Sequence, residues 1–160
     1  MRDAEQLLVA CHFGSISEAE IHEFINSVTN SDEEYAPMIF DAYNHDVAVS
    51  RSNLELFLRK SLPDFEFYSE DGILACRREL KRQIERLLRK EGSQQEFCDF
   101  FNRLEFDLVI NHDIAIEFFG DLWNACDCFD ENWQFKPSDY LEEEAMRVLA
   151  TINLAENAAS

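Results

Sequence analysis

Apolar residues recur along this chain at intervals of three and four residues, the spacing that lines one face of an α-helix. The chain has only four Gly and three Pro, and its Val, Ile and Thr residues are too scattered to build alternating strands. We therefore predict an all-α fold, a single helical domain over residues 1–160 built as a bundle of about seven to eight helices. Residues 155–160 are expected to form a frayed tail.

Local end signals place the first two helices. Residues 4–13 carry an apolar stripe that stops at Gly14, a residue suited to the left-handed backbone at a helix C-terminus. Ser17 and Glu20 then have the spacing of a capping box, in which each side chain accepts a hydrogen bond from the backbone N–H of the other residue. The helix that begins there has four inward positions: Ile21, Phe24, Ile25 and Val28.

The next segments lead to a helix rich in basic residues. We predict a third helix over residues 33–44 and a fourth over residues 53–61. Residues 62–68 alternate and suit either an extended loop or one edge strand, of which we favour the loop. The fifth helix is expected over residues 73–91, closed by Gly92. It has five inward side chains: Ile73, Leu80, Ile84, Leu87 and Leu88.

The C-terminal part repeats the same signals. Ser93 and Glu96 form a second capping box. The sixth helix that follows has the inward side chains Phe97, Phe100, Phe101, Leu104 and Leu108. A seventh helix starts at Asp113 or its neighbour and carries an apolar stripe: Ala115, Phe118, Phe119, Leu122, Trp123 and Cys126. Ser138 caps an eighth, with the stripe Leu141, Ala145, Val148, Leu149 and Ile152. An acidic loop with aromatic residues, 127–137, connects these two helices.

Two segments of the chain also resemble each other. Residues 24–26 and 39–44 are echoed by residues 100–102 and 119–124, and each group follows a helix ended by Gly and a capping box. The offset changes from 76 to 80 residues between the two matches, and short matches also arise by chance between amphipathic helices. Two explanations stay open: chance, or a duplicated three-helix unit over residues 4–46 and 73–127.

The charge is divided unevenly along the chain. The 160 residues carry 33 Asp and Glu and 14 Lys and Arg, a formal net charge of −19. Residues 73–92 hold half of the basic side chains and have a net charge of +4, while residues 1–72 and 93–160 have net charges of −11 and −12. Acidic chains that stay disordered lack aromatic residues, whereas this one has 14 Phe, 4 Tyr and 2 Trp. We therefore expect the acidic side chains to belong to a folded domain and not to a disordered tail.

The basic helix has two interpretations. Its cationic side chains could suggest nucleic acid, but a net charge of −19 repels phosphate, and Glu79 and Glu85 interrupt the run. We therefore expect no direct contact with nucleic acid, and we expect the basic helix to neutralise acidic helices of its own fold. The basic side chains are Arg77, Arg78, Lys81, Arg82, Arg86, Arg89 and Lys90.

No residue pattern identifies a reaction. Cys126 and Cys128 lack the second cysteine pair of a structural zinc site, and residues 127–132 lack the Gly and the terminal Glu of a calcium-binding loop. Cys11 and His12 are adjacent in sequence, which on a helix turns their side chains apart and does not make a catalytic dyad. We therefore expect no enzyme, no metal and no cofactor.

The chain shows no signal for a membrane or for secretion. No apolar run is long enough to span a bilayer, and residues 1–5 have neither the basic start nor the apolar centre of a signal peptide. We therefore expect a cytosolic location without membrane contact. The five Cys residues are predicted to be reduced and mostly buried.

The excess of acidic side chains indicates a basic protein as partner. A strongly acidic surface speeds the encounter with a basic protein, and Trp among charged residues is a typical anchor of an interface. Trp133 could equally pack its loop against the body of the protein. We predict a partner-binding set from the seventh helix and the loop that follows it: Asp121, Asp127, Phe129, Asp130, Glu131 and Trp133.

Helix-end and apolar patterns occur in residues 7–21 (LLVACHFGSISEAEI) and in the later stretch 96–124, which begins with EFCDFF and ends with DLWN. In these patterns the chain resembles small α-helical immunity proteins of bacterial contact-dependent inhibition and polymorphic toxin systems. The resemblance covers about two-thirds of the chain. It implies a cytosolic, non-enzymatic protein that binds its cognate toxin domain and blocks the active site or an essential surface. Such toxins are often nucleases, whose basic surfaces suit an acidic inhibitor, and no contact residue carries over.

A second class of function stays open beside the inhibitor. A helical scaffold or regulatory adaptor could dock its basic helix, residues 73–91, onto an acidic surface, including that of a second copy of the chain. Charge reversal at Arg78, Arg82 and Arg86 distinguishes the two, because only the adaptor should lose its partner. An enzyme is a third and less favoured alternative.

Overall fold

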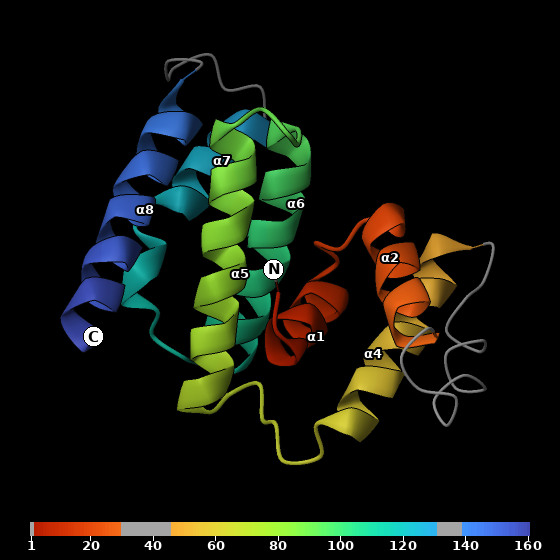
Figure 1. Cartoon of the computed structure of the whole chain (residues 1–160). Coiled ribbons are helices and arrows are strands. Elements are labelled where there is room, and N and C mark those ends of the chain that lie inside the picture. Colours follow the sequence, from red (N-terminus) through yellow and green to blue (C-terminus); the bar gives the residue numbers. More distant parts are fainter. Residues whose placement is uncertain (1, 30–45, 131–138) are drawn as a thin grey trace. The chain divides into compact units, whose positions relative to one another are not determined.

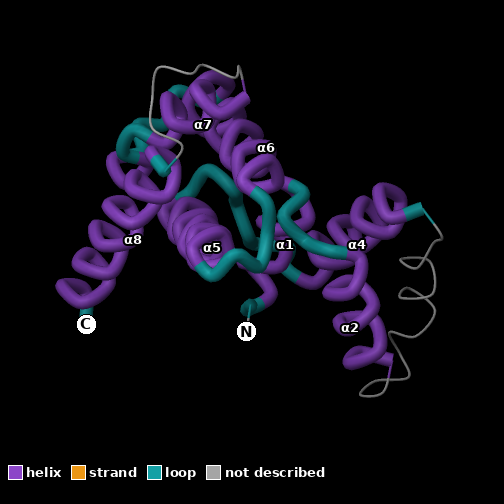
Figure 2. The backbone as a smooth tube through the Cα atoms, turned by 90° about the horizontal axis from the view of Figure 1, so that it is seen from above, coloured by secondary structure: helices purple, strands orange, loops and turns teal. Residues whose placement is uncertain are grey.

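Helices make up the fold throughout the part of the chain that the structure describes. A computed structural model describes residues 2–29, 46–130 and 139–160, and these contain seven α-helices and no strand (Figure 1; Figure 2). The all-α prediction is therefore confirmed. The predicted third helix, residues 33–44, lies outside the described residues.

The chain divides into two compact units, Met1–Phe67 (unit 1) and Tyr68–Ser160 (unit 2), and each is described by itself. The sequence pattern predicted one domain over residues 1–160. The boundary falls at the end of the connector 62–68, which is a loop, as favoured. Phe67 closes unit 1, because its ring is buried and packs edge-on against Phe13 with the centroids 6.4 Å apart.

Unit 1 contains three described helices: α1 (Ala4–Phe13), α2 (Glu18–Thr29) and α4 (Val47–Ser61). α4 packs against both α1 and α2. Gly14 ends α1 with a left-handed backbone, φ 72°, and Ser17 and Glu20 form the expected capping box at the start of α2. The first two predicted helices are confirmed, and local hydrogen bonds define the end of α1 and the start of α2.

α4 begins six residues earlier than the predicted start at residue 53. The side chain of Asp46 accepts a hydrogen bond from the backbone N–H of Ala48 at 2.9 Å and caps the helix there. The first turn holds Val47 and Val49 with exposed side chains. The apolar stripe on which the prediction relied is therefore missing from that turn.

Unit 2 contains four described α-helices, a π-helical segment and a 3₁₀ turn: α5 (Glu70–Leu88), α6 (Gln94–Glu105), η1 (Phe106–Asn111), η2 (Glu117–Phe119), α7 (Leu122–Asp130) and α8 (Tyr140–Ala159). α5 lies between α6 and α8 and packs against both, and α7 also packs against both (Figure 1). Their core includes large, fully buried side chains: Phe100, Phe101, Leu104, Leu108, Leu122 and Ile152.

α5 is shifted by three residues toward the N-terminus relative to its predicted range, 73–91. Ser69 caps its start by accepting a hydrogen bond from the backbone N–H of Gly72 at 3.1 Å. Gly92 does not close the helix, because the left-handed backbone belongs to Lys90, φ 61°. Arg89 and Lys90 therefore follow α5 and do not form its last turn.

α6 begins at the second predicted capping box. The five side chains predicted to face inward from the sixth helix are all buried, four of them in α6 and Leu108 in η1. Ser93 Oγ accepts from the N–H of Glu96 at 3.0 Å, and the Glu96 carboxylate accepts from the N–H of Ser93 at 3.2 Å. The helix then widens into η1, and the N–H of Ile114 closes this segment on the carbonyl of Leu108 at 2.9 Å.

The predicted seventh helix is interrupted. η2 is followed by Gly120, whose φ of 54° and ψ of −135° are strongly unfavourable for residues with a side chain. Ala115 and Trp123, which the unbroken stripe placed inward, are exposed. The predicted loop 127–137 also begins later, because α7 continues to Asp130.

α8 is longer than predicted. It continues through residues 155–159, where we expected a frayed tail. There Glu156 Oε2 accepts a hydrogen bond from Lys81 Nζ at 2.6 Å, which connects the last turns of α8 to α5. The predicted cap, Ser138, lies outside the described residues. Of the predicted stripe, only Leu149 is half-buried, and its other four members are buried.

The internal similarity has one structural counterpart. A residue with a left-handed backbone follows the first helix of each unit, Gly14 after α1 and Lys90 after α5. A Ser–Glu capping box starts three residues later in both units. Residues 39–44 lie outside the described residues. Duplication of a three-helix unit therefore stays a prediction.

Candidate partner-binding surface

Two basic side chains of the α5 region pair with acidic side chains of α8. Lys81 Nζ lies 2.6 Å from Glu156 Oε2, and Lys90 forms an ion pair with Glu142. For these two of the seven basic side chains, the contacts agree with the expectation that the basic helix balances acidic helices of its own fold. Surface ion pairs of this kind contribute little to stability. Their main effect is that the paired basic side chains are less available to a binding partner.

α5 also buries an acidic residue and a thiol. Glu79 is fully buried, and its Oε1 accepts a hydrogen bond from Gln83 Nε2 at 2.8 Å. Burial, and then the charges of Asp107 and Glu79, raise the pKa of the Cys76 thiol to about 12, so this thiol stays neutral and unreactive. The four cysteines whose side chains are described are free and buried, as predicted: Cys11, Cys76, Cys98 and Cys126.

Asp121, the first predicted partner-binding residue, makes contacts within unit 2. Its carboxylate accepts hydrogen bonds from the hydroxyl of Tyr140 and from Asn124 Nδ2, the latter at 3.1 Å. Its backbone N–H donates to the buried carboxylate of Glu144 at 3.0 Å. Asp121 therefore attaches the start of α7 to α8 and is half-buried.

The other predicted partner-binding residues lie further along α7 and beyond it. Asp127 is exposed on α7. Phe129 and Asp130 belong to α7, but their side chains lie outside the described part of the structure, as do Glu131 and Trp133 altogether. Of the predicted residues whose side chains the structure describes, Asp127 is exposed and Asp121 is half-buried.

Trp123 is the surface residue that the sequence pattern missed. We predicted it to face inward, yet 49% of its surface is exposed. It lies one helical turn before Asp127, so both side chains project from the same face of α7. A helical wheel that starts at Leu122 would have found it, because Leu122, Ala125 and Cys126 already fill the buried face.

Glu105, at the end of α6, adds a second carboxylate to this surface. Burial, and then the charge of Asp127, raise the pKa of Glu105 above its ordinary value of 4.5. The two carboxylates therefore lie close enough to repel each other, and no basic side chain of the described residues forms an ion pair with either of them. We call Glu105, Trp123 and Asp127 the α6–α7 patch.

A second polar cluster lies at η1. The Tyr68 hydroxyl donates to Asp107 Oδ2 at 3.0 Å, and its ring stacks on His112 with the centroids 3.6 Å apart. Nδ1 of His112 lies 2.8 Å from the carbonyl oxygen of Asp107. These contacts connect the first residue of unit 2 to η1. Within residues 2–29, 46–130 and 139–160, no group of three or more His, Cys, Asp or Glu side chains could hold a metal ion.

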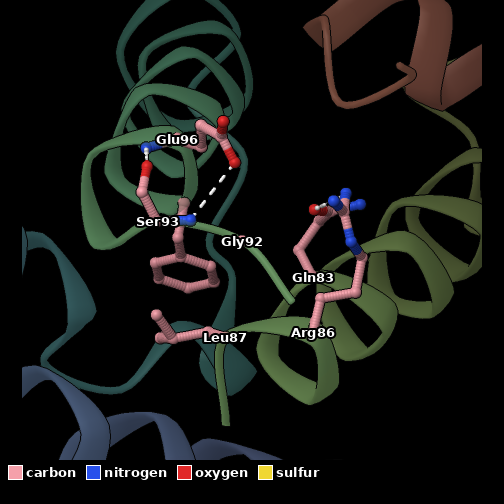
Figure 3. A pocket seen from close by; sticks show the side chains of 7 residues that line it. Gln83, Arg86, Leu87, Gly92, Ser93 and Glu96 are labelled. Atoms are coloured by element: carbon pink, nitrogen blue, oxygen red, sulfur yellow. Dashed lines mark hydrogen bonds between the residues drawn. The ribbon is translucent and has the colours of Figure 1, made fainter. Parts of the chain in front are cut away.

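A small pocket lies where α5 leads into α6 (Figure 3), lined by Gln83, Arg86, Leu87, Gly92, Ser93, Glu96 and Phe97. It has room for about one water molecule and not for an organic substrate. Its charged groups also have partners: Glu96 belongs to the capping box, and Arg86 Nη1 donates to Gln83 Oε1 at 3.3 Å. The pocket is therefore not a candidate active site.

In unit 1, His12 of α1 contacts Glu55 of α4. His12 Nδ1 lies 2.9 Å from Glu55 Oε1, and Arg59 Nη2 donates to the same oxygen at 2.8 Å. Burial alone would raise the pKa of Glu55, but these hydrogen bonds outweigh it and lower the pKa below its ordinary value of 4.5. Cys11 is buried, and Nδ1 of His12 contacts the Glu55 carboxylate.

Replacing Glu55 by Gln is expected to destabilise unit 1 at neutral pH and to matter less in acid. Because the folded pKa of Glu55 is lowered, its carboxylate stabilises the fold above the unfolded pKa, and this contribution is lost as the pH falls through the folded pKa. Urea unfolding, followed by circular dichroism from about pH 7 to about pH 3, should show the difference between E55Q and the unchanged chain shrinking toward acid. Glu23→Gln, exposed on α2, is the control, and a pH-independent difference would contradict the assignment.

Comparison with known proteins adds no relative. No protein-family model matches the chain, and searches of curated proteins and of solved structures find no match either. Among the described helices, none is long and apolar enough to cross a membrane. The candidate surface therefore rests on the geometry of this chain.

Proposed function

We propose that the chain is a non-enzymatic binding protein that neutralises a basic cognate toxin domain, with a nuclease as the expected toxin, by covering its active site or an essential surface. The distribution of charge carries this proposal. Unit 1 has 13 Asp and Glu against 4 Lys and Arg, and unit 2 has 20 against 10. Both units are therefore acidic, including the one that contains the basic helix.

Two ion pairs of the α5 region support the same proposal. Lys81 and Lys90 pair with carboxylates of α8 and are therefore less available to a partner. Acidic side chains elsewhere in unit 2 are exposed, among them Asp99, Asp113, Glu117 and Asp127. The negative electrostatic potential of these carboxylates raises the rate of encounter with a basic protein by about one to three orders of magnitude. An adaptor that docks through the basic helix receives less support from these contacts.

Co-expression of the chain with the product of the neighbouring reading frame tests the proposal. We expect the two proteins to copurify and the toxic activity of that product to be lost at equal concentrations. The association rate should fall by about tenfold or more between low and high salt, since exposed charges are screened. If the chain has no affinity for the neighbouring product, the proposal is wrong. If the association rate does not depend on the salt concentration, electrostatic steering is not part of the mechanism.

A further inference from the structure

We infer that the α6–α7 patch is the seat of an arginine side chain from a basic protein partner, with the indole of Trp123 against the guanidinium plane and Glu105 and Asp127 pairing its charge. The inference rests on the proposed function for the class of partner, a basic protein. It adds where on the chain that partner is held and through which type of side chain.

The backbone supplies the arrangement of the patch. Trp123 and Asp127 are four residues apart on α7 and therefore neighbours on one helix face. Glu105 ends α6, which packs against α7. Figure 2 shows these two helices side by side. A half-exposed indole thus lies in the same surface as two carboxylates that come from different helices.

The electrostatics of the patch favour a cation. Burial and the charge of Asp127 oppose ionisation of Glu105, and the described residues supply no ion pair to offset this. A guanidinium placed between the carboxylates would pair with both and lower the pKa of Glu105 again. Binding should therefore release protons from the complex in mildly acidic buffer.

Arginine fits the patch better than other occupants. Its planar guanidinium stacks on an aromatic face and donates two parallel hydrogen bonds to carboxylates, whereas the lysine ammonium is a compact, strongly hydrated charge. Phosphate groups of nucleic acid would meet two carboxylates and a net charge of −19. A second copy of the chain is also acidic in both units.

Nuclear magnetic resonance of the ¹⁵N-labelled full chain, titrated with octa-arginine, locates the seat. We expect the indole N–H of Trp123 and the amides of Glu105 and Asp127 to shift first and to saturate together, ahead of the amide of Glu143, an exposed carboxylate residue of α8. Uniform shifts at all acidic residues, or shifts that appear on concentrating the chain without peptide, would overturn the inference.

Isosteric variants measure the contribution of each charge. Glu105→Gln and Asp127→Asn should each weaken octa-arginine binding by about fivefold, and Trp123→Ala by about tenfold, in calorimetric titrations. Glu143→Gln removes one exposed charge from α8 of the same unit and should change the affinity by less than about twofold. Octa-lysine should bind more weakly than octa-arginine. Equal losses in control and patch variants, or equal binding of the two peptides, would contradict the arginine seat.

Failure of the seat and failure of the proposed function are distinguishable. If the patch variants still bind and inhibit the neighbouring gene product with unchanged affinity, the seat is wrong and the function stands. If octa-arginine binds at the patch while the neighbouring product is neither bound nor inhibited, the seat stands and the function is wrong.

Discussion

Replacing Phe101 by Ala is expected to lower the free energy of unfolding of unit 2 by about 4 kcal/mol. Phe101 is fully buried in α6. Its ring meets Phe119 edge-on with the centroids 5.1 Å apart and stacks with Phe97 at 6.4 Å. Truncation therefore removes buried apolar surface and leaves a cavity between α6 and η2. Both Trp residues belong to unit 2, so thermal unfolding followed by their fluorescence should show a melting temperature lower by roughly 15 °C or more.

Phe106→Ala is the matched control for this truncation. It makes the same chemical change five residues later, at a side chain that is 58% exposed in η1. The expected loss is below about 1 kcal/mol, because little apolar surface leaves a buried environment. Similar losses in the two variants would contradict the placement of Phe101 in the core.

Replacing Gly120 by Ala is expected to destabilise unit 2 by about 3 kcal/mol. Its φ of 54° and ψ of −135° lie in a region that costs any residue with a side chain roughly 1–3 kcal/mol. A Cβ atom there would also lie 2.8 Å from Oε1 of Glu144 and 3.0 Å from Cγ2 of Val148. Glu144 is buried and holds the N–H of Asp121, so it cannot move away without losing that bond. Urea unfolding followed by Trp fluorescence measures the loss.

Gly92→Ala is the control for the glycine substitution. Gly92 has no left-handed backbone, and its added Cβ would meet Glu96 Oε2 at 3.2 Å, the far end of a flexible side chain. We expect the free energy of unfolding to change by less than about 1 kcal/mol. A tolerated Ala at position 120 together with a harmful one at position 92 would reverse the roles assigned to these glycines.

Helix ends with a complete local signal were predictable from the sequence. The capping boxes at Ser17 and Ser93 and the left-handed end at Gly14 are found where the pattern placed them. Each depends on hydrogen bonds between residues at most five positions apart, so the rest of the fold has little influence on them. The inward stripe of α6 was predictable for a related reason, since its spacing alone defines one helix face.

Helix ends without such a signal were not predictable. Asp46 and Ser69 cap α4 and α5 ahead of turns that lack an apolar stripe, so the helices start earlier than predicted. Lys90 adopts the left-handed backbone although Gly92 is nearby. The break at Gly120 depends on its contact with Glu144, which comes 24 residues later in the chain.

The residues of the candidate surface also differ in how far the sequence predicted them. Asp127 could be proposed from the acidic composition of its segment. Trp123 could be found only with a helix that starts at Leu122, and the break before α7 that sets this start was not predicted. Glu105 joins the patch only through the packing of α6 against α7, which brings it near a residue 22 positions away.

The sequence alone establishes the helical class, the capped starts of α2 and α6 and an acidic body that contains one basic helix, because these follow from residue types and short-range spacing. The tertiary structure decides which charges are paired within unit 2 and which carboxylates share a surface with an exposed indole. Those properties depend on distances between side chains of different helices, and the position of a residue along the chain does not define such distances.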